Sequence, residues 1–278
     1  MKIIGPGAKT LIHGAIILYL IFLLFPLLWV VASSLKPTQE IYSGSPTILP
    51  HVVSLDHYRS VIDGQQIFRS MWNSAIVGAV STILVVLLAV PSAYAMVRYK
   101  SVVNNAILGW ILISQIFPVI LVMIPLYVLL RSMGLTDSLT GLTLIYIVWS
   151  LPFVLWMMHG YVKSIPLELE EAAVIDGASR MQVIFKILMP LLLPAIGASA
   201  LFAFISAWNE FFFALVLMKS PTLATLQVEL ARYTGMEGQA RTGPLAAASV
   251  IATIPSVVLF VFMRKWFTTG LVSGALKG

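Results

Sequence analysis

Four of the eleven carboxylates of this 278-residue chain lie between Glu168 and Asp176, and long apolar runs flank them on both sides. In so apolar a chain, a cluster of acids marks a surface that meets water or another protein rather than hydrocarbon. The stretch is Glu171-Ala172-Ala173-Val174-Ile175-Asp176-Gly177-Ala178, and Ile187-Leu188-Met189-Pro190 closes it. It predicts a docking element for a cytosolic partner.

Local rules predict two short helices bent at a glycine in this stretch. Ser164 is placed to cap the first helix, and the acids that follow lie at the end where the helix dipole favours negative charge. We expect Gly177 to end this helix, because glycine turns left-handed without strain. Ser179 and Gln182 have the spacing of a capping box, which begins a second short helix that Pro190 interrupts.

With E-A-A-x-x-D-G-A at 171–178, an isoleucine nine residues later and then a proline, the segment resembles the EAA loop of binding-protein-dependent ABC importer permeases. Met189 departs from the usual leucine, in a swap that conserves volume. In that family the bent helix sits in a groove of the ATPase subunit. The resemblance therefore implies ATPase coupling by Glu171, Ala172, Ala173, Asp176, Gly177, Ile187 and Pro190.

Other segments are similar to those of carbohydrate permeases for di- and oligosaccharides. Among these permeases, the chain resembles the smaller permease subunit of maltose importers. These segments are Ser34-Leu35-Lys36-Pro37, Ala93-Tyr94-Ala95 and the C-terminal stretch from Gly270 to Gly278. The resemblance implies a complex with a second homologous permease subunit, two ATPase subunits and an extracytoplasmic sugar-binding protein. It implies no cofactor on this chain, since ATP and Mg belong to the ATPase subunits. Loop 218–243 would reach the binding protein as a scoop.

Composition independently predicts a polytopic membrane protein. The chain is 59% hydrophobic and 10% charged, with a mean hydropathy of +0.97, whereas charged residues make up roughly a quarter of soluble domains. The apolar runs are continuous, which excludes the alternation of barrel strands. We expect an all-α membrane protein, and the resemblance implies the six transmembrane helices of the ABC type I importer permease fold with a cytoplasmic EAA coupling helix.

We expect a single transmembrane permease domain over residues 1–278. The predicted spans lie at about 11–34, 73–97, 106–130, 139–161, 190–217 and 244–266, because each run is long enough to cross a hydrocarbon core of about 30 Å. The connecting segments are a coupling loop at 162–190 and outer loops at 35–72 and 218–243.

Six spans put both termini on one side of the cytoplasmic membrane. With the termini in the cytoplasm, ten lysines and arginines lie inside and seven outside, as the positive-inside rule favours. The EAA resemblance implies the same orientation, because its loop must face cytosolic ATP. The net charge of +6 is explained by anionic lipid headgroups near the inner loops and needs no nucleic acid.

Polar residues inside the apolar runs are candidates for the translocation path. A carboxylate such as Glu210 at mid-helix costs roughly 2.5–3.5 kcal/mol and therefore faces a neighbour or a watery path. Two interpretations stay open for Asn209, Glu210 and Gln115: they line the path, or they hold helices together. A proton- or ion-coupled secondary transporter with Glu210 as its relay is the alternative function.

Enzymatic interpretations find no support in the sequence. Lysines followed by Ser or Thr lack the preceding glycine of a Walker A loop, and no Gly-x-Ser-x-Gly elbow occurs. The four histidines have no metal-ligand spacing, and there is no cysteine. We therefore predict neither a catalytic residue nor a metal site, and expect a chain that is not itself an enzyme.

Overall fold

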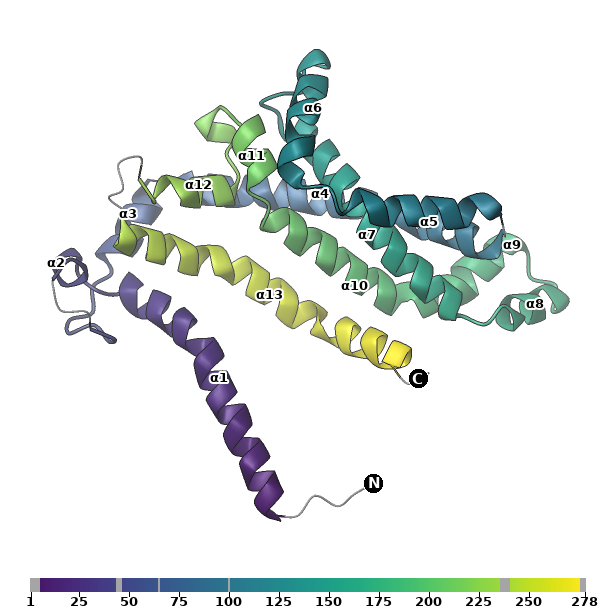
Figure 1. Cartoon of the computed structure of the whole chain (residues 1–278), viewed down its shortest axis with the longest axis horizontal. Coiled ribbons are helices and arrows are strands. Elements are labelled where there is room, and N and C mark those ends of the chain that lie inside the picture. The colour runs from purple at the N-terminus through teal and green to yellow at the C-terminus, as the bar shows by residue number, and fades with distance from the viewer. Residues whose placement is uncertain (1–5, 44–46, 65, 100, 236–240, 276–278) are drawn as a thin grey trace. The chain divides into compact units, whose positions relative to one another are not determined.

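The computed structural model describes residues 6–43, 47–64, 66–99, 101–235 and 241–275, which form helices and loops without a strand among them (Figure 1). Their contacts divide the chain into two compact units. The first combines Met1–Phe68 with Glu229–Ile254, and the second combines Arg69–Val228 with Pro255–Gly278. The predicted all-α class is confirmed, whereas the single domain stays a prediction.

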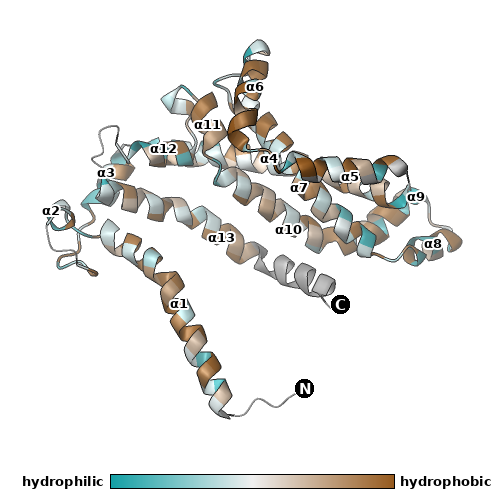
Figure 2. Ribbon diagram, in the orientation of Figure 1, coloured by the Kyte–Doolittle hydropathy of each residue, from teal (hydrophilic) through white to brown (hydrophobic). Residues whose placement is uncertain are grey.

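The first unit contains a long apolar helix and the start of another. Helix α1 (Pro6–Ser34) has only 6% of its most apolar stretch buried, and Figure 2 colours most of it as hydrophobic. Helix α13 (Thr242–Ala275) begins in this unit and continues into the second. Such exposed apolar surface suits a helix that is surrounded by lipid or by other chains. The polar segment that follows α1 contributes α2 (Thr38–Ile41) and α3 (Asp56–Asp63).

Polar contacts order the first half of the loop expected at 35–72. The Glu40 carboxylate accepts hydrogen bonds from the Thr47 hydroxyl at 2.8 Å and from the backbone N–H of His51 at 3.1 Å. The hydrogen bond from Thr47 lowers the pKa of the Glu40 carboxyl below its ordinary value. The Lys36 ammonium donates to the Thr47 carbonyl.

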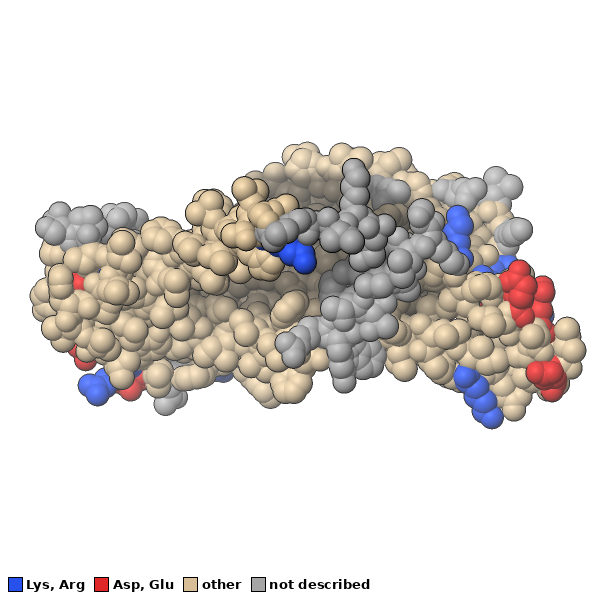
Figure 3. All heavy atoms as spheres, turned by 90° about the horizontal axis from the view of Figure 1, so that it is seen from below, with Lys and Arg blue, Asp and Glu red and all other residues tan. Residues whose placement is uncertain are grey.

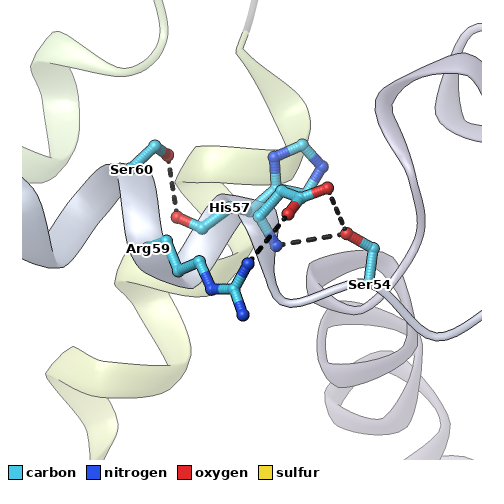
Figure 4. A network of polar contacts seen from close by, with 5 residues as sticks. Ser54, His57, Arg59 and Ser60 are labelled. Atoms are coloured by element: carbon cyan, nitrogen blue, oxygen red, sulfur yellow. Dashed lines mark hydrogen bonds and ion pairs between the residues drawn. The ribbon is translucent and has the colours of Figure 1, made fainter.

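A second network stabilises the start of α3 (Figure 4). The Ser54 hydroxyl donates to the Asp56 carboxylate and accepts from its backbone N–H, at 2.8 and 3.1 Å. The Ser60 hydroxyl donates to the carbonyl of His57 at 2.8 Å. Side-chain hydrogen bonds of this kind stabilise turns and helix starts, and they do so in the described part of this loop.

The second unit is a helical bundle built around α7 (Leu139–Ser164). This helix packs against α10 (Met189–Trp208) and α5 (Val102–Ser114), which lie beside it in Figure 1. The elements that lie wholly or mostly in this unit also include α4 (Gln66–Arg98), α6 (Val119–Ser132), α8 (Glu168–Ile175), α9 (Arg180–Gln182), η1 (Val183–Leu188), α11 (Phe212–Leu217) and η2 (Pro221–Leu223), whereas α12 (Leu226–Arg232) starts here and ends in the first unit.

Two apolar cores stabilise this bundle. One contains Tyr146 and Phe213 and joins α6, α7 and α11, and the other contains Val154 and Met158 and joins α4, α7 and α10. Small residues four apart on α10 are buried as well, namely Ala195, Ser199 and Ala203. They let neighbouring backbones approach closely, as is typical of membrane helices.

Among the described residues, five helices are long and apolar enough to cross a membrane. They are Gly7–Ser34, Gln66–Arg98, Leu139–Ser164, Arg180–Trp208 and Thr242–Phe262. They overlap five of the six predicted spans. The predicted span at 106–130 instead divides into α5 and α6, so its crossing of the membrane as one element stays a prediction.

A proline explains why the segment at 106–130 is not one helix. Pro118 has no N–H to donate and disfavours helical backbone in the residue before it. Helix α5 ends at Ser114, and Pro118 is the residue before the first turn of α6. A continuous hydropathy run therefore conceals a change of backbone direction.

Pro190 does not interrupt the helix that it was expected to end. Residues Arg180–Trp208 form one helical run, in which the π-helical turn η1 precedes α10. In this turn the N–H of Met189 bonds to the carbonyl of Ile184, five residues back. The wider turn accommodates Pro190, whose ring would clash with the carbonyl four residues back in a regular α-helix. The expectation of an interruption was therefore wrong.

The close approach of a loop to the start of α7 gives a test of this packing. A Cβ atom on Gly141 would overlap the carbonyl oxygen of Leu135. We expect Gly141→Ala to lower the free energy of unfolding by about 1–3 kcal/mol, as overpacking does. Thermal unfolding of the purified protein in detergent measures this loss.

Gly160→Ala is the matched control on the same helix, because nothing lies within 4 Å of a Cβ atom there. This substitution should be neutral or slightly stabilising, since alanine is the better helix former. Equal unfolding midpoints for the two variants would contradict the close contact at Gly141.

Candidate functional site

The end of α8 has the geometry expected at Gly177. Its φ angle is +86°, and Asp176 precedes it as the C-cap. The N–H of Ala178 bonds to the carbonyl of Ala173 at 2.9 Å, and the N–H of Gly177 bonds to that of Val174 at 3.0 Å. These two bonds are the Schellman motif, which turns the chain sharply after the helix. The predicted bend at Gly177 is confirmed.

The capping box that begins the second short helix is also present. The backbone N–H of Gln182 bonds to the Ser179 hydroxyl at 3.4 Å, and the Gln182 side chain accepts from the N–H of Ser179 at 2.8 Å. The predicted cap of the first helix is wrong, because Ser164 donates to the carbonyl of Tyr161 within α7. Ile165 precedes a proline and is extended, so a corner separates Ser164 from α8.

An ion pair fixes α8 to the end of α4. The Arg98 Nε lies 2.6 Å from Glu170 Oε1, and Nη2 donates to the carbonyl of Ile165 at 3.0 Å. The hydroxyl of Tyr94 donates to the other oxygen of Glu170 at 3.0 Å. Glu170 is only 7% exposed. These four residues are called the α4–α8 clasp below.

The sequence prediction missed this clasp, although the spacing of residues on α8 indicates which acid faces inward. Glu170 and the buried Ala173 are three residues apart and therefore lie on one face of α8. Glu171 and Ala172 are exposed on the opposite side. Two adjacent acids thus have different tasks, since one is paired inside the protein and its neighbour remains accessible.

A small apolar core supports the coupling element, which we define as residues 165–190. It consists of Ala173, Val183 and Leu188, with Ile187 packed against them. The structure thereby brings two of the predicted coupling residues together, Ala173 and Ile187. Pro190 lies apart from Gly177, in the first turn of α10.

The outer surface of the coupling element combines acids with exposed apolar side chains. Ile175 is 86% exposed, and Met181 and Phe185 are 63% and 61% exposed. Figure 3 shows a group of acidic atoms at the end of the molecule that carries α8 in Figure 1. Beside it lies a cavity of about 490 Å³, lined in part by Glu171, Ile175 and Arg180. An exposed apolar patch bounded by charges is typical of a protein interface.

Glu210 lies in a break between helices rather than at the middle of one. Helix α10 ends at Trp208, and α11 starts at Phe212. The carboxylate accepts hydrogen bonds from the N–H groups of Phe213 at 2.8 Å and Ala214 at 3.2 Å. The hydroxyl of the buried Tyr146 donates to it at 2.8 Å. Glu210 thus satisfies the free N–H groups that start α11.

The structure does not assemble the other path candidates around Glu210. The side chain of Asn209 donates to the carbonyl of Ile205 at 2.9 Å, one turn back on α10. Gln115 is exposed in the break between α5 and α6. Asn209, Glu210 and Gln115 all lie at helix interruptions, and the role of each in a path stays a prediction.

Two side chains of α4 hold the first part of the loop at 218–243. The Asn73 amide donates to the carbonyls of Thr222 at 3.0 Å and Ala224 at 2.9 Å. The Ser74 hydroxyl accepts from the N–H of Leu226 at 2.8 Å. The segment 222–226 is therefore fixed to α4. Residues 236–240 of the same loop lie outside the described part.

Asp137 fixes the turn before α7 to the turn after α11. Its carboxylate accepts hydrogen bonds from the hydroxyl of Ser220 at 2.5 Å and from the N–H groups of Ser220 and Lys219 at 3.0 and 2.9 Å. The Ser220 hydroxyl is the main cause that lowers the pKa of the Asp137 carboxyl. Asp137 has a φ of +53°, which aspartate tolerates better than most residues.

The whole chain is similar to known membrane proteins. Residues 85–272 match the family described as "Binding-protein-dependent transport system inner membrane component". The chain is 45% identical over 229 residues to the putative ABC transporter permease protein ORF1 of Streptomyces antibioticus, which covers 82% of this chain and 100% of that protein. It is 33% identical over 275 residues to the trehalose transport system permease protein SugB of Mycobacterium tuberculosis, covering 98% and 100%.

A solved structure shows the same fold. It is the crystal structure of a bacterial ABC transporter involved in the import of alginate, with a TM-score of 0.78 and 24% identity to one of its chains. The match covers 96% of this chain and 100% of that chain. The chain therefore shares its overall fold with one chain of that importer.

The three hydrogen bonds to Glu210 predict how its variants behave. Glu210→Gln keeps one acceptor oxygen, whereas Glu210→Leu leaves the donors of Phe213, Ala214 and Tyr146 without a partner. We expect Glu210→Leu to lower the free energy of unfolding by about 1–3 kcal/mol and Glu210→Gln by less. Tyr146→Phe, which removes one donor, is the control, and denaturant unfolding in detergent measures all three. A loss in Glu210→Leu no larger than in Glu210→Gln would contradict this capping role.

The lowered pKa of Asp137 predicts a pH-dependent contribution to stability. A carboxyl with a depressed folded-state pKa stabilises the protein above its unfolded pKa of about 3.9 and loses that effect as pH falls through the folded value. Asp137→Asn should therefore destabilise the protein at neutral pH, and the difference from wild type should shrink below that range. Unfolding curves at several pH values check this, with the exposed Asp63→Asn as control. A difference that is constant with pH would contradict the assignment.

Proposed function

The chain belongs to the family of binding-protein-dependent transport system inner membrane components, and on this premise we propose that it moves di- or oligosaccharides across the cytoplasmic membrane. It is a multi-pass membrane permease of the ABC importer type. Three relatives that match nearly the whole chain are named as permease proteins of transport systems for trehalose, diacetylchitobiose and trehalose/maltose. This similarity along the full length is the observation that carries the sugar proposal.

The coupling element is the site where the chain meets an ATPase subunit. Glu171, Ala172 and Ile175 are exposed there, and the adjacent cavity can take a side chain from the partner. The Schellman turn at Gly177 presents these residues on a short rigid helix rather than on a flexible loop. The exposed acids favour a partner groove with basic side chains.

The rest of the complex consists of partners in separate chains. We expect a second homologous permease subunit, two ATPase subunits that bind ATP and Mg, and an extracytoplasmic sugar-binding protein. An alginate importer of the same fold was solved with its periplasmic protein carrying an alginate pentasaccharide. Both termini of the chain lie in the cytoplasm in this arrangement, and the segment 222–226 faces the binding protein.

Transport follows alternating access. ATP closes the ATPase pair, and the coupling element carries this movement through the main chain into α7 and α10. The path then opens outward beneath the docked binding protein. Each ligand shifts the complex because it binds one of the two states more tightly.

The alternative, a secondary transporter with Glu210 as a proton relay, is not favoured by any contact of that residue. Three donors occupy the carboxylate, and two of them belong to the backbone that starts α11. A relay has to exchange its proton with a path. Capping requires instead that an acceptor oxygen stay in place beside the N–H groups of α11.

Uptake by the reconstituted complex tests the function. The binding protein is first screened by thermal shift against trehalose, maltose and diacetylchitobiose. Vesicles that contain the permeases and ATPases are then supplied with that binding protein, the radiolabelled sugar that binds, and internal ATP. We expect uptake that needs ATP and survives dissipation of the pH gradient. Uptake driven by an imposed pH gradient without ATP, and lost in Glu210→Gln, would overturn the proposal.

Charge reversal at Glu171 tests the docking surface. We expect Glu171→Lys to weaken attachment of the ATPase by about 10-fold or more, because it adds repulsion and an unpaired charge at a packed interface. Copurification with a tagged ATPase measures the attachment. Asp63→Lys reverses an exposed charge at the end of α3 and should leave the yield unchanged. Equal yields for both variants would mean that another surface binds the ATPase.

A further inference from the structure

Helix α4 holds a functional segment at each of its ends. Near its C-terminus, Tyr94 and Arg98 form the α4–α8 clasp with the coupling element. Near its N-terminus, Asn73 and Ser74 hold the segment 222–226. All of these contacts lie within the second unit. One helix therefore connects the segment that meets the ATPase with the segment assigned to the binding protein.

The clasp is built from charged groups that are almost withdrawn from water. The Arg98 and Glu170 side chains are 12% and 9% exposed, and their ion pair measures 2.6 Å. Burial of such a pair costs desolvation, so the pair is weak evidence for stability as such. It does fix geometry, because Arg98 also bonds the carbonyl of Ile165 and thereby holds both sides of the corner between α7 and α8.

Helix α4 is not joined directly to the coupling element by the main chain. That element continues directly from α7 and into α10, whereas about 70 residues of chain separate it from the end of α4. Tyr99, just beyond α4, adds one more side-chain contact by accepting a hydrogen bond from Arg180 at 3.3 Å. Movement of α8 therefore reaches α4 through side chains, and Arg98 makes the shortest of these bonds.

The two sets of contacts are far apart but lie on one continuous helix. Ser74 and Arg98 lie about 36 Å apart along the helix axis, since each helical residue adds about 1.5 Å. The helix is continuous over Gln66–Arg98 and carries no charged residue between Arg69 and Arg98. Pro91 lies inside α4 without ending it. A helix that stays continuous can transmit a displacement along its axis, whereas the broken segments at 115–118 and 209–211 can absorb one.

Resting on the function proposed above, we propose that α4 mechanically links the coupling element to the segment 222–226, with Arg98 as the positioning residue that fixes α4 to α8. Displacement of α8 by the ATPase then moves the segment beneath the binding protein. Docking of the binding protein moves the segment 222–226 and acts on the ATPase by the same route in the opposite direction.

Arg98→Gln in the reconstituted complex separates coupling from assembly. We expect the ATPase to stay bound and basal hydrolysis to change by less than about twofold, while uptake and stimulation of hydrolysis by the binding protein fall about 10-fold. The number of ATP molecules hydrolysed per sugar therefore rises. Lys163→Gln, an exposed change in the last turn of α7, is the control. A fall of basal hydrolysis in proportion to uptake, with an unchanged number of ATP molecules hydrolysed per sugar, overturns the proposal.

A cross-link at the clasp tests the link itself. The chain has no cysteine, so Arg98→Cys with Glu170→Cys gives one reactive pair. The reduced pair should be uncoupled like Arg98→Gln, and a short bifunctional thiol reagent should restore at least about half of the wild-type coupling. A cross-linked complex that stays uncoupled overturns the proposal.

If Arg98→Gln fails to assemble, Tyr94→Phe is the second variant, because it removes a single bond of the clasp. An unchanged number of ATP molecules hydrolysed per sugar in Tyr94→Phe would also overturn the proposal.

A variant at the N-terminal end of α4 tests the proposal independently. Asn73→Leu removes both hydrogen bonds to the segment 222–226 and should lower stimulation by the binding protein. Because the two sites act in series, Arg98→Gln with Asn73→Leu should be no worse than the more severe single change. Independent, multiplying losses overturn the α4 link.

The experiments also separate failure of the α4 link from failure of the proposed function. A wild-type complex without ATP-driven sugar uptake refutes the proposed function. A wild-type complex that is coupled, together with an Arg98→Gln complex that is coupled equally well, refutes the α4 link alone.

Discussion

A backbone that crosses hydrocarbon has to satisfy its own hydrogen bonds, and this constraint explains where the helices of this chain are interrupted. Each interruption has a local solution. Glu210 supplies acceptors for the N–H groups at the start of α11, and the π-helical turn at 183–188 accommodates Pro190 without ending the helix. Around Pro118 the chain changes direction between two short helices. Asn209 and Glu210 therefore pair backbone groups at the ends of broken helices.

Local rules predicted the parts of the site that depend on nearest neighbours. The left-handed Gly177 and the Ser179–Gln182 box follow from residue types a few positions apart, because glycine and capping side chains act within one turn. The same rules failed at Ser164, where an extended residue before a proline moved the start of α8 beyond its reach. Hydropathy found five spans but not the breaks at Pro118 and Asn209, since an apolar average does not record backbone direction.

The α4–α8 clasp could not be predicted in the same way, because its partners are distant in sequence. Arg98 and Glu170 are 72 residues apart, and each has an ordinary local explanation, as a basic residue at a helix end or as an acid in a first turn. Only packing decides that Glu170 turns inward. Since adjacent helical residues point about 100° apart, Glu171 must then face away from α4. The burial of one acid thereby determines the exposure of the next, and the clasp and the docking surface are two consequences of one helix orientation.

The burial of the Arg98–Glu170 ion pair also explains how α8 can keep its orientation under load. An exposed ion pair contributes about 0–1 kcal/mol and yields to solvent and salt, so it could not hold α8 in one orientation while a partner pulls on it. The pair in the clasp lies in a less polar setting, with Tyr94 and the Ile165 carbonyl using the remaining bonding positions. Loss of either charge would leave the other buried and unpaired, which is far more costly than the pair itself is stabilising. A contact of this kind resists separation but adds little to the total stability, and these are the properties required of a joint between moving helices.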